Sequence, residues 1–431
     1  MRHSCFRIGV VAVLAAVVVA TGVASPAATG RPNIIFILAD DLGLPGVSCY
    51  GGEYPTPNLD ALAARGIRFE NCFASPLCAP SRAMAMTGRY GFRTGVVDNP
   101  LGARATPKRE VSIAKVLQGA GYVTGVFGKW RQLAHFKTRA DAQAWGFDEF
   151  LLWGSGSGEG SDRYWGGGYN LNGAPLKVPP QTYGPDLLQE HLVDFIRRHR
   201  DRRFFVYYPM TLVHGTYQPT PATRPGVKDR RTLYRDMIRY MDKLVGDLVG
   251  ELDALGLREK TLIVFTGDNG SVDPGLVHGR PVDGVKHELR EGGSRVPLIV
   301  HWKGTTPAGA VLPDLTDFTD FYVTFAELAG AALPPGHTLD GRSFAPQLRG
   351  RKGRPREWVF VQLADRWYVR DARWKLYNDG TLCDMRDAPF SETPLRPDEM
   401  TPETKAARER LQAVLDQLNP GQIKAAPKYK P

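Results

Sequence analysis

Short apolar runs recur along the chain and alternate with amphipathic segments. Residues 33–39, NIIFILA, are apolar except at the first position, a pattern typical of a strand buried on both faces of a sheet. In the segments between such runs, apolar residues recur three and four positions apart, as on one face of a helix. This alternation predicts an α/β fold, with a large sheet flanked by helices on both faces. The further expected strands are residues 122–127, 204–208, 261–266 and 296–300, and the clearest helices cover residues 188–196 and 237–255.

The pattern changes near Gly350. Beyond it, the chain carries short segments typical of a small antiparallel sheet, followed by an amphipathic helix over residues 401–418. We therefore expect a main domain, residues 31–350, and a C-terminal subdomain, residues 351–431. The Gly-rich stretch 154–173 has no period and predicts a surface loop. The expected strands of the small sheet are residues 358–363, 367–370 and 374–377.

The first 28 residues have a composition of their own. Arg2 and Arg7 lie before or at the start of an apolar run over residues 8–23, and small residues follow. This layout is typical of a cleavable signal peptide, because the run is shorter than a comfortable membrane span. An uncleaved anchor is the alternative. We expect residues 1–28 to be removed from an exported protein, periplasmic or secreted, with no integral membrane span after cleavage.

The overall charge narrows the possible partners only a little. The 431 residues include 55 Lys and Arg against 45 Asp and Glu, a formal net charge of +10. Such a balance suits anionic ligands in general, although charge dispersed for solubility is the simpler explanation. Because the chain has no RNP, zinc-finger or helix-turn-helix pattern, we expect no nucleic-acid partner.

Four cysteines follow the N-terminal segment. They form no CxxC pair and no histidine lies at ligand spacing from them, so we do not expect a zinc site. An even number in an oxidising compartment allows two disulfides. If Cys78 takes part in chemistry, three cysteines remain and at most one disulfide can form. The four are Cys49, Cys72, Cys78 and Cys383.

Acidic and amide residues follow two of the expected strands. Asp40 and Asp41 come after the first strand, and Asp268 and Asn269 follow a later one. In open α/β sheets, functional residues gather beyond the carboxyl ends of the strands. These hard oxygen ligands suit Ca²⁺ or Mg²⁺, provided that the first strand ends at Asp40 so that adjacent acids can share an ion. Turn formation or helix capping is the alternative role.

Basic residues follow two further strands at the same expected edge. The strand over residues 122–127 leads into Gly128 and Lys129, and the strand over residues 204–208 leads to His214. We therefore expect acids, an amide, a lysine and a histidine to meet in one place.

The segment CAPSRAMAMTGR, residues 78–89, carries the strongest chemical signal. Pro80 favours a helix start and Gly88 a helix end. Cys78 therefore lies at a helix N-terminus, where free N–H groups favour an anion and lower the pKa of a thiol. A small buried cysteine beside an ordinary helix start is the alternative.

This segment resembles the signature of type I sulfatases. Cys78-Ala-Pro-Ser-Arg82, four further residues and Thr87-Gly88-Arg89 match that signature in order and spacing. The resemblance extends over residues 31–305 through PNIIFILADDLG, TPNLDALAARGIRF, FTGDNG and KHELREGGSRVPLIVHWKG, with a weaker similarity in VRDARWKLYNDGTLCDM. It implies an alkaline phosphatase-like fold and hydrolysis of an aryl or carbohydrate sulfate ester.

The resemblance also implies a modified nucleophile. In this family a formylglycine-generating enzyme, which recognises Pro80 and Ser81, oxidises the cysteine to formylglycine on the unfolded chain. One hydroxyl of the hydrated aldehyde attacks sulfur and displaces the alcohol. The other hydroxyl then expels sulfate by re-forming the aldehyde, so that covalent catalysis divides one hard displacement into two steps.

Roles for the remaining candidates follow from the same resemblance. The metal ligands would be Asp40, Asp41, Asp268, Asn269 and modified Cys78, with Ca²⁺ as the expected ion and Mg²⁺ as the alternative. Arg82 would steady the hydrate. Lys129 and Lys286 would bind the sulfate oxygens, and His214 would protonate the leaving oxygen as general acid.

One position departs from the family. The usual histidine two residues after the Gly-Lys lysine is Arg131 here, and arginine cannot accept a proton near neutral pH. Either His135 substitutes or sulfate release differs, and we expect Arg131 to contact sulfate. Two alternative functions follow: a phosphonate monoester or phosphodiester hydrolase of the same superfamily, and an exported sulfate-ester binding protein with impaired turnover. Two lysines around one tetrahedral anion favour the sulfatase.

Overall fold

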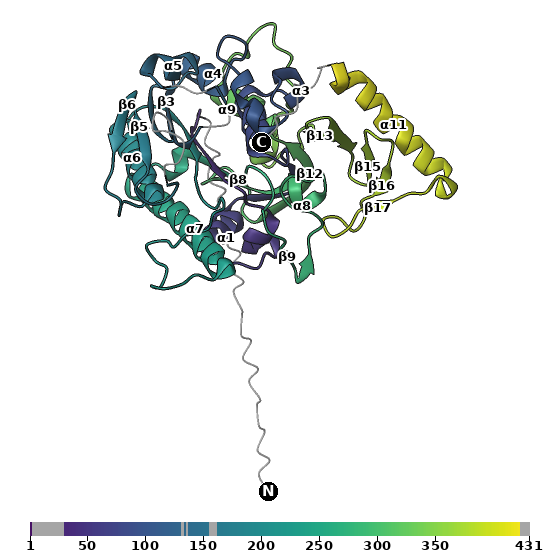
Figure 1. Ribbon diagram of the computed structural model, residues 1–431, viewed down its shortest axis with the longest axis horizontal. Coiled ribbons are helices and arrows are strands. Elements are labelled where there is room, and N and C mark those ends of the chain that lie inside the picture. Colours follow the sequence, from purple (N-terminus) through teal and green to yellow (C-terminus); the bar gives the residue numbers. More distant parts are fainter. Residues whose placement is uncertain (2–29, 131–132, 135–136, 155–161, 423–431) are drawn as a thin grey trace.

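A large mixed sheet forms the centre of the protein (Figure 1). The computed structural model describes residues 1, 30–130, 133–134, 137–154 and 162–422. In spatial order, the ten strands of this sheet are β12 (Ala310–Asp317), β2 (Ile67–Phe73), β11 (Arg295–Trp302), β8 (Thr261–Gly267), β1 (Asn33–Ala39), β7 (Phe204–Pro209), β3 (Val123–Lys129), β4 (Glu149–Trp153), β5 (Gly168–Leu171) and β6 (Ala174–Lys177).

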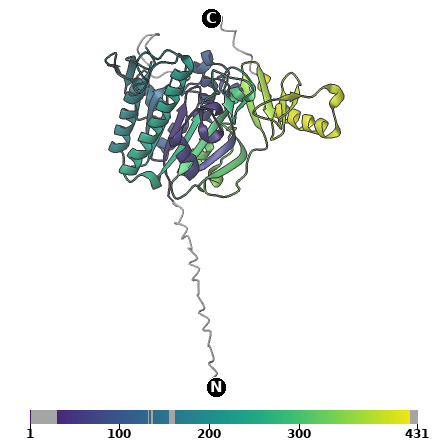
Figure 2. The ribbon, with the colours of Figure 1, turned by 90° about the horizontal axis from the view of Figure 1, so that it is seen from below.

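Helices cover both faces of this sheet, as the sequence predicts. Successive side chains of β1 pack alternately into two separate cores, Phe36 into one and Ile37 into the other. The long helices of one layer lie side by side outside the strands in Figure 2, coloured teal. One face carries α1 (Pro57–Arg65), α6 (Gly184–Arg198) and α7 (Arg230–Ala254), and the other carries α2 (Cys78–Thr87), α4 (Ile113–Gly119) and α9 (Asp320–Ala329).

The strands that position the site run parallel. β1 pairs in parallel with both β7 and β8, and β3 pairs in parallel with β7. The carboxyl ends of these four strands therefore meet at one edge of the sheet. β11 is antiparallel to both of its neighbours, which makes the sheet mixed.

A small antiparallel sheet follows and lies beside the main body (Figures 1 and 2). Phe73 and Leu289 of the main body pack against Val359 and Tyr368 of this sheet in one apolar cluster. The predicted α/β class with a C-terminal antiparallel sheet and helix is confirmed. The elements are β13 (Val359–Leu363), β14 (Arg366–Arg370), β15 (Trp374–Tyr377), β16 (Leu382–Asp384), β17 (Thr393–Pro394) and α11 (Pro402–Leu418).

The prediction of a surface loop over residues 154–173 is wrong for its last part. There β5 pairs with β4 and β6, and Tyr169 and Asn170 are buried. The glycines hid this short strand because they remove the alternation on which strand prediction depends. The remaining α-helices and strands of the described residues are short: α3 (Gly91–Thr94), α5 (Arg139–Ala144), β9 (Leu276–Val277), β10 (Arg280–Pro281), α8 (Glu291–Ser294) and α10 (Ala345–Leu348).

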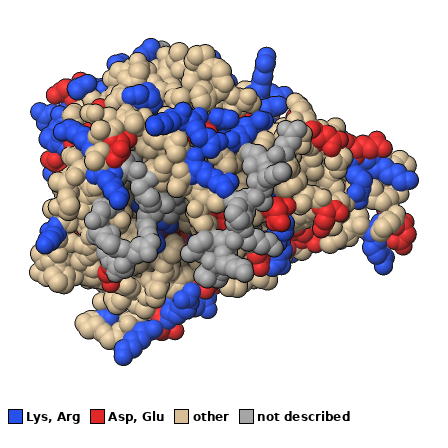
Figure 3. All heavy atoms as spheres, turned by 45° about the horizontal axis from the view of Figure 1, so that its top comes forward, with Lys and Arg blue, Asp and Glu red and all other residues tan. Residues whose placement is uncertain are grey.

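Three further expectations concern membrane, redox and charge properties. Within the described ranges, none of the helices has the length and apolar character needed to span a bilayer. The predicted signal peptide lies, apart from Met1, outside the described residues. The four cysteines after it are unpaired. On the face in Figure 3, Lys and Arg side chains form several groups, with Asp and Glu among them.

Candidate active site

The turn after β1 brings two adjacent carboxylates to the same side. β1 ends at Ala39, and Asp41 has a φ of 61°, in the left-handed region. The backbone N–H of Asp41 donates to Oδ1 of Asp268 at 3.0 Å, which ties this turn to the end of β8. Because the chain leaves the extended conformation here, Asp40 and Asp41 do not point in opposite directions as they would along a strand.

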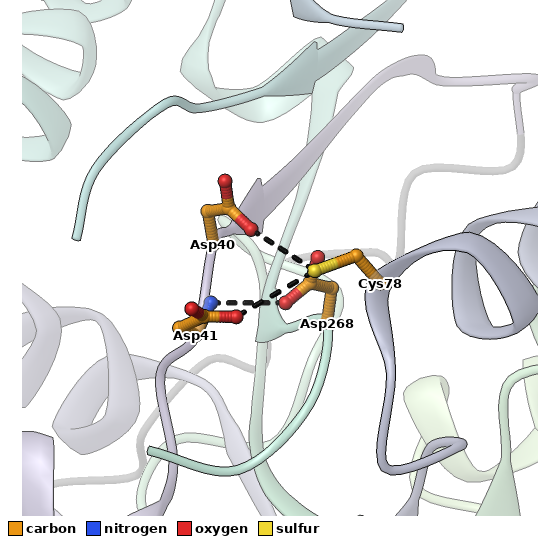
Figure 4. Close-up of side chains that lie close together, drawn as sticks. All are labelled: Asp40, Asp41, Cys78 and Asp268. Carbon is orange, nitrogen blue, oxygen red and sulfur yellow. Dashed lines mark hydrogen bonds between the residues drawn. The ribbon is translucent and has the colours of Figure 1, made fainter. Parts of the chain in front are cut away.

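Cys78 lies against this acidic cluster at the start of α2 (Figure 4). Its Sγ is 3.4 Å from Oδ1 of Asp40 and 3.6 Å from Oδ1 of Asp41. Four possible ligand atoms lie within 4.8 Å of one another, one each from Asp40, Asp41, Cys78 and Asp268. α2 ends at Thr87, and Gly88 follows with a φ of 67°, so the predicted helix is confirmed.

The expected lowering of the thiol pKa is wrong. Burial raises the pKa of Cys78 well above its ordinary value, and the charge of Asp268 adds to this effect. Removal from water and nearby carboxylates outweigh the helix N-terminus, because both disfavour a thiolate. An unmodified Cys78 is therefore a poor nucleophile in this site.

Three cationic side chains enclose the carboxylates. Nζ of Lys129 is 2.8 and 2.7 Å from the two oxygens of Asp40. Nζ of Lys286 is 2.7 and 2.8 Å from those of Asp41 and 3.6 Å from Sγ of Cys78. The guanidinium of Arg82 binds Asp268 through Nε at 2.9 Å and Nη2 at 2.7 Å. All three predicted cations therefore lie around position 78.

His214 lies in the segment after β7, at the more exposed side of the site. Its Nε2 is 3.6 Å from Oδ2 of Asp41, and its Nδ1 contacts the carbonyl oxygen of Gly215. Burial lowers the pKa of His214 to about 4, which keeps the ring neutral at pH 7. The ring must gain a proton before it can act as a general acid, and that role stays a prediction.

Arg163 is a site residue that the sequence reasoning missed. Its Nη1 lies 2.7 Å from Oδ2 of Asp40, and its guanidinium lies over the ring of Trp153, 4.5 Å from the centroid. Burial alone would raise the pKa of Asp40, but the surrounding cations, Lys129 foremost, hold it well below its ordinary value. The available signal was that Arg163 is the one basic residue in the Gly-rich stretch 154–173.

The buried oxygens fit a hard divalent cation. Nδ2 of Asn269 donates to Oδ1 of Asp41 and to the carbonyl oxygen of Gly270, both at 2.9 Å, whereas its buried Oδ1 has no hydrogen-bond partner. This orphaned oxygen and three adjacent carboxylates form the donor set that Ca²⁺ or Mg²⁺ prefers. Arg131 and His135, the two candidates next to Lys129, lie outside the described residues.

The architecture and the site define the class of protein. A mixed sheet with helices on both faces presents acids from β1 and β8, a lysine from β3 and a helix-terminal cysteine at one edge. This arrangement is that of an alkaline phosphatase-like hydrolase. A sulfatase family model matches residues 32–331, and the chain belongs to the sulfatase family. It is a sulfuric ester hydrolase, as the signature at Cys78 predicts.

Comparisons with individual proteins agree. Human arylsulfatase A is 33% identical over 363 residues, which cover 76% of this chain and 70% of that protein. The N-acetylgalactosamine-6-sulfatase of Canis lupus familiaris is 32% identical over 372 residues, covering 77% and 68%. The crystal structure of Ps i-CgsB superimposes with a TM-score of 0.76 at 27% identity, covering 90% of this chain and 92% of the other.

Proposed function

We propose that the chain hydrolyses an aryl or carbohydrate sulfate ester with a nucleophile made from Cys78 and with a divalent cation. The observation that carries this proposal is the cluster around Sγ of Cys78, which has Asp40, Asp41 and Lys286 within 3.6 Å. A buried thiol whose pKa is raised is a poor nucleophile there. Conversion to formylglycine by a formylglycine-generating enzyme during maturation would provide the hydroxyl of an aldehyde hydrate instead.

Four side chains would hold the cation, together with the modified residue 78. Asp40, Asp41, Asp268 and Asn269 supply the oxygens, with Ca²⁺ as the proposed ion and Mg²⁺ as the alternative. The bound ion would supply positive charge that attracts a sulfate oxygen and favours ionisation of a hydroxyl. Arg82 keeps Asp268 in place through two contacts.

The remaining cations would bind the sulfate group. Lys129 and Lys286 are buried, and in a site that excludes water their charges act on an anion more strongly than at the surface. We assign them the sulfate oxygens, with Arg131 as a further sulfate contact. His214 has the more exposed position at which a leaving alcohol would depart, and we assign it proton donation to the leaving oxygen.

Sulfate release tests the nucleophile directly. Protein made together with a formylglycine-generating enzyme should release sulfate from 4-nitrophenyl sulfate, and Cys78→Ala should reduce release to background. Cys49→Ala is the matched control, because Cys49 is another unpaired cysteine that makes no contact with the acidic cluster. Full turnover by Cys78→Ala would exclude the proposed nucleophile.

Two further outcomes of the same assay correspond to the alternative functions. Faster cleavage of a nitrophenyl phosphodiester than of the sulfate would identify a phosphorus-ester hydrolase. Tight binding of the sulfate ester without any turnover would identify a binding protein.

Export of the protein is also proposed from the sequence. Residues 1–28 carry the layout of a signal peptide, which would direct the chain to the periplasm or the medium. N-terminal sequencing of the protein recovered from those fractions, beginning near residue 29, is the expected result. Recovery of the intact N-terminus in the membrane fraction would favour an uncleaved anchor.

A further inference from the structure

Arg163 is held rigidly at the edge of the site. Its guanidinium lies over the ring of Trp153, and Nε1 of Trp153 donates to the carbonyl oxygen of Asp162 at 3.1 Å. On its other side, Nη1 binds Oδ2 of Asp40 at 2.7 Å. A planar guanidinium fixed in this way loses little further freedom when it binds a ligand.

This arginine lies nearer to solvent than the two lysines. The side chains of Lys129 and Lys286 are 3% and 6% exposed, against 17% for Arg163 and 28% for His214. The next residue, Tyr164, donates to the carbonyl oxygen of His214 at 2.5 Å. The hydrogen bond of Tyr164 therefore keeps the segments of Arg163 and His214 together at the more exposed side of the site. The alcohol part of an ester would lie at this side.

Asp40 does not need the charge of Arg163. Both of its oxygens already accept hydrogen bonds from Lys129. Among the described residues around Cys78, the cations Arg82, Lys129, Arg163 and Lys286 outnumber the carboxylates Asp40, Asp41 and Asp268 by one, before any metal ion is bound. A sulfate monoester carries one negative charge, which would balance this excess. The divalent cation that the acidic cluster would hold adds two positive charges, so the occupied site would have positive charge beyond what the scissile group requires.

We propose that Arg163 binds a second anionic group of the substrate, a carboxylate or another sulfate, next to the sulfate that is cleaved. The flat fork of N–H donors on a guanidinium matches the oxygens of either group. The inference rests on the proposed function and adds a substrate class to it: esters with a second acidic group close to the scissile sulfate.

Two aryl esters that differ in one charge provide the test. 2-Carboxyphenyl sulfate and 2-carbamoylphenyl sulfate have the same shape, and only the first carries a second negative charge. Comparing each variant with wild type on each ester cancels their different intrinsic reactivity. Arg163→Met should lower kcat/KM for the carboxylate ester about 10- to 100-fold more than for the amide, the worth of one charge-assisted hydrogen bond. For Arg163→Lys, the loss of kcat/KM on the carboxylate ester relative to the amide should lie between that of wild type and that of Arg163→Met.

Arg373→Met is the matched control. Arg373 also lies over a tryptophan ring, 4.5 Å from the centroid of Trp374, and also binds a carboxylate, Glu403 at 2.8 Å, but it lies in the turn between β14 and β15 of the C-terminal sheet. Arg373→Met should leave the ratio of kcat/KM between the two esters unchanged. An equal fall for both esters in Arg163→Met, or no fall beyond that of Arg373→Met, would overturn the inference.

A binding measurement separates this inference from the catalytic proposal. In the Cys78→Ala background, calorimetry should find tighter binding of the carboxylate ester than of the amide, and Arg163→Met should remove that preference. If wild type hydrolyses neither ester, the proposed function fails for aryl sulfates, and the calorimetric preference still decides the role of Arg163. If wild type hydrolyses both and the preference is absent, only the role of Arg163 fails.

Discussion

Lys375 connects the C-terminal sheet to the segment that carries Lys286. It lies on β15, its side chain is 0% exposed, and Nζ donates to the carbonyl oxygen of Leu289 at 2.7 Å and to a carboxylate oxygen of Glu392. Leu289 is three residues from Lys286. Lys375→Met keeps the length and the apolar stem of the side chain and removes only the charge and the donors.

The cost of this change can be worked out from the contacts. Removing one partner of a buried ion pair costs about 3–5 kcal/mol, and the lower end applies here because Tyr377 still donates to Glu392 at 2.5 Å. The entropy of unfolding for a chain of 431 residues is on the order of 0.9 kcal/mol per degree. A loss of about 3 kcal/mol therefore lowers Tm by about 3 °C.

Thermal unfolding and kinetics together test this reasoning. Well below Tm, Lys375→Met should still show a reduced kcat/KM for 4-nitrophenyl sulfate, because the segment with Lys286 loses an anchor. Lys243→Met is the control: Lys243 forms an exposed ion pair with Asp247 at 2.6 Å, which is worth less than about 1 kcal/mol. If Lys375→Met matches this control in both Tm and kcat/KM, the anchoring role is refuted.

Three further predictions follow from other contacts. Gly128→Ala should abolish stable folding or sulfate release, measured by circular dichroism and turnover, because Gly128 has a φ of 141° and a Cβ there would lie 1.9 Å from the carbonyl oxygen of Pro209; normal folding and activity would contradict the contact. Ca²⁺ at a hundredfold excess over Kd should stabilise the protein by about 2.7 kcal/mol and so raise Tm. Asp268→Asn should remove this increase in Tm, whereas Asp273→Asn should keep it, because Asp273 pairs with Arg230 at 2.9 Å outside the acidic cluster. Burial beside an arginine lowers the pKa of His301 from 6.5 to about 4, so the folded state binds its proton less readily than the unfolded state. The neutral His301 therefore contributes about 3 kcal/mol to the free energy of unfolding above pH 6.5, and this contribution is lost as the pH falls towards 4. Measured by urea unfolding, the free energy of unfolding of His301→Phe should depend less on pH over this range than that of wild type. An unchanged pH dependence would contradict this assignment.

The parts of the fold that were predictable are those with two buried faces. β1 could be located to the residue because both of its faces are apolar. β2 and β12, by contrast, lie towards one edge of the sheet, and partly exposed charged residues occur in both, with Pro313 in β12. Polar residues and proline at a sheet edge remove the apolar pattern on which prediction depends.

The site was predictable where it depends on strand ends, and not where it depends on loops or burial. Asp40, Asp41 and Asp268 follow two predicted strands whose carboxyl ends were expected at one edge of the sheet, so their meeting could be expected. Arg163 reaches Asp40 from a loop whose path no local pattern encodes. The direction of the Cys78 pKa shift depends on how much water and how many carboxylates surround the thiol, and neither can be read from a helix start.

The mass of the peptide that contains Cys78 is the most direct test of the proposed nucleophile. Fully active protein, made together with a formylglycine-generating enzyme and digested with protease, should yield this peptide with an aldehyde in place of the thiol, and protein made without that enzyme should yield the thiol and little activity. An intact thiol at Cys78 in protein that hydrolyses sulfate esters at the full rate would contradict the account.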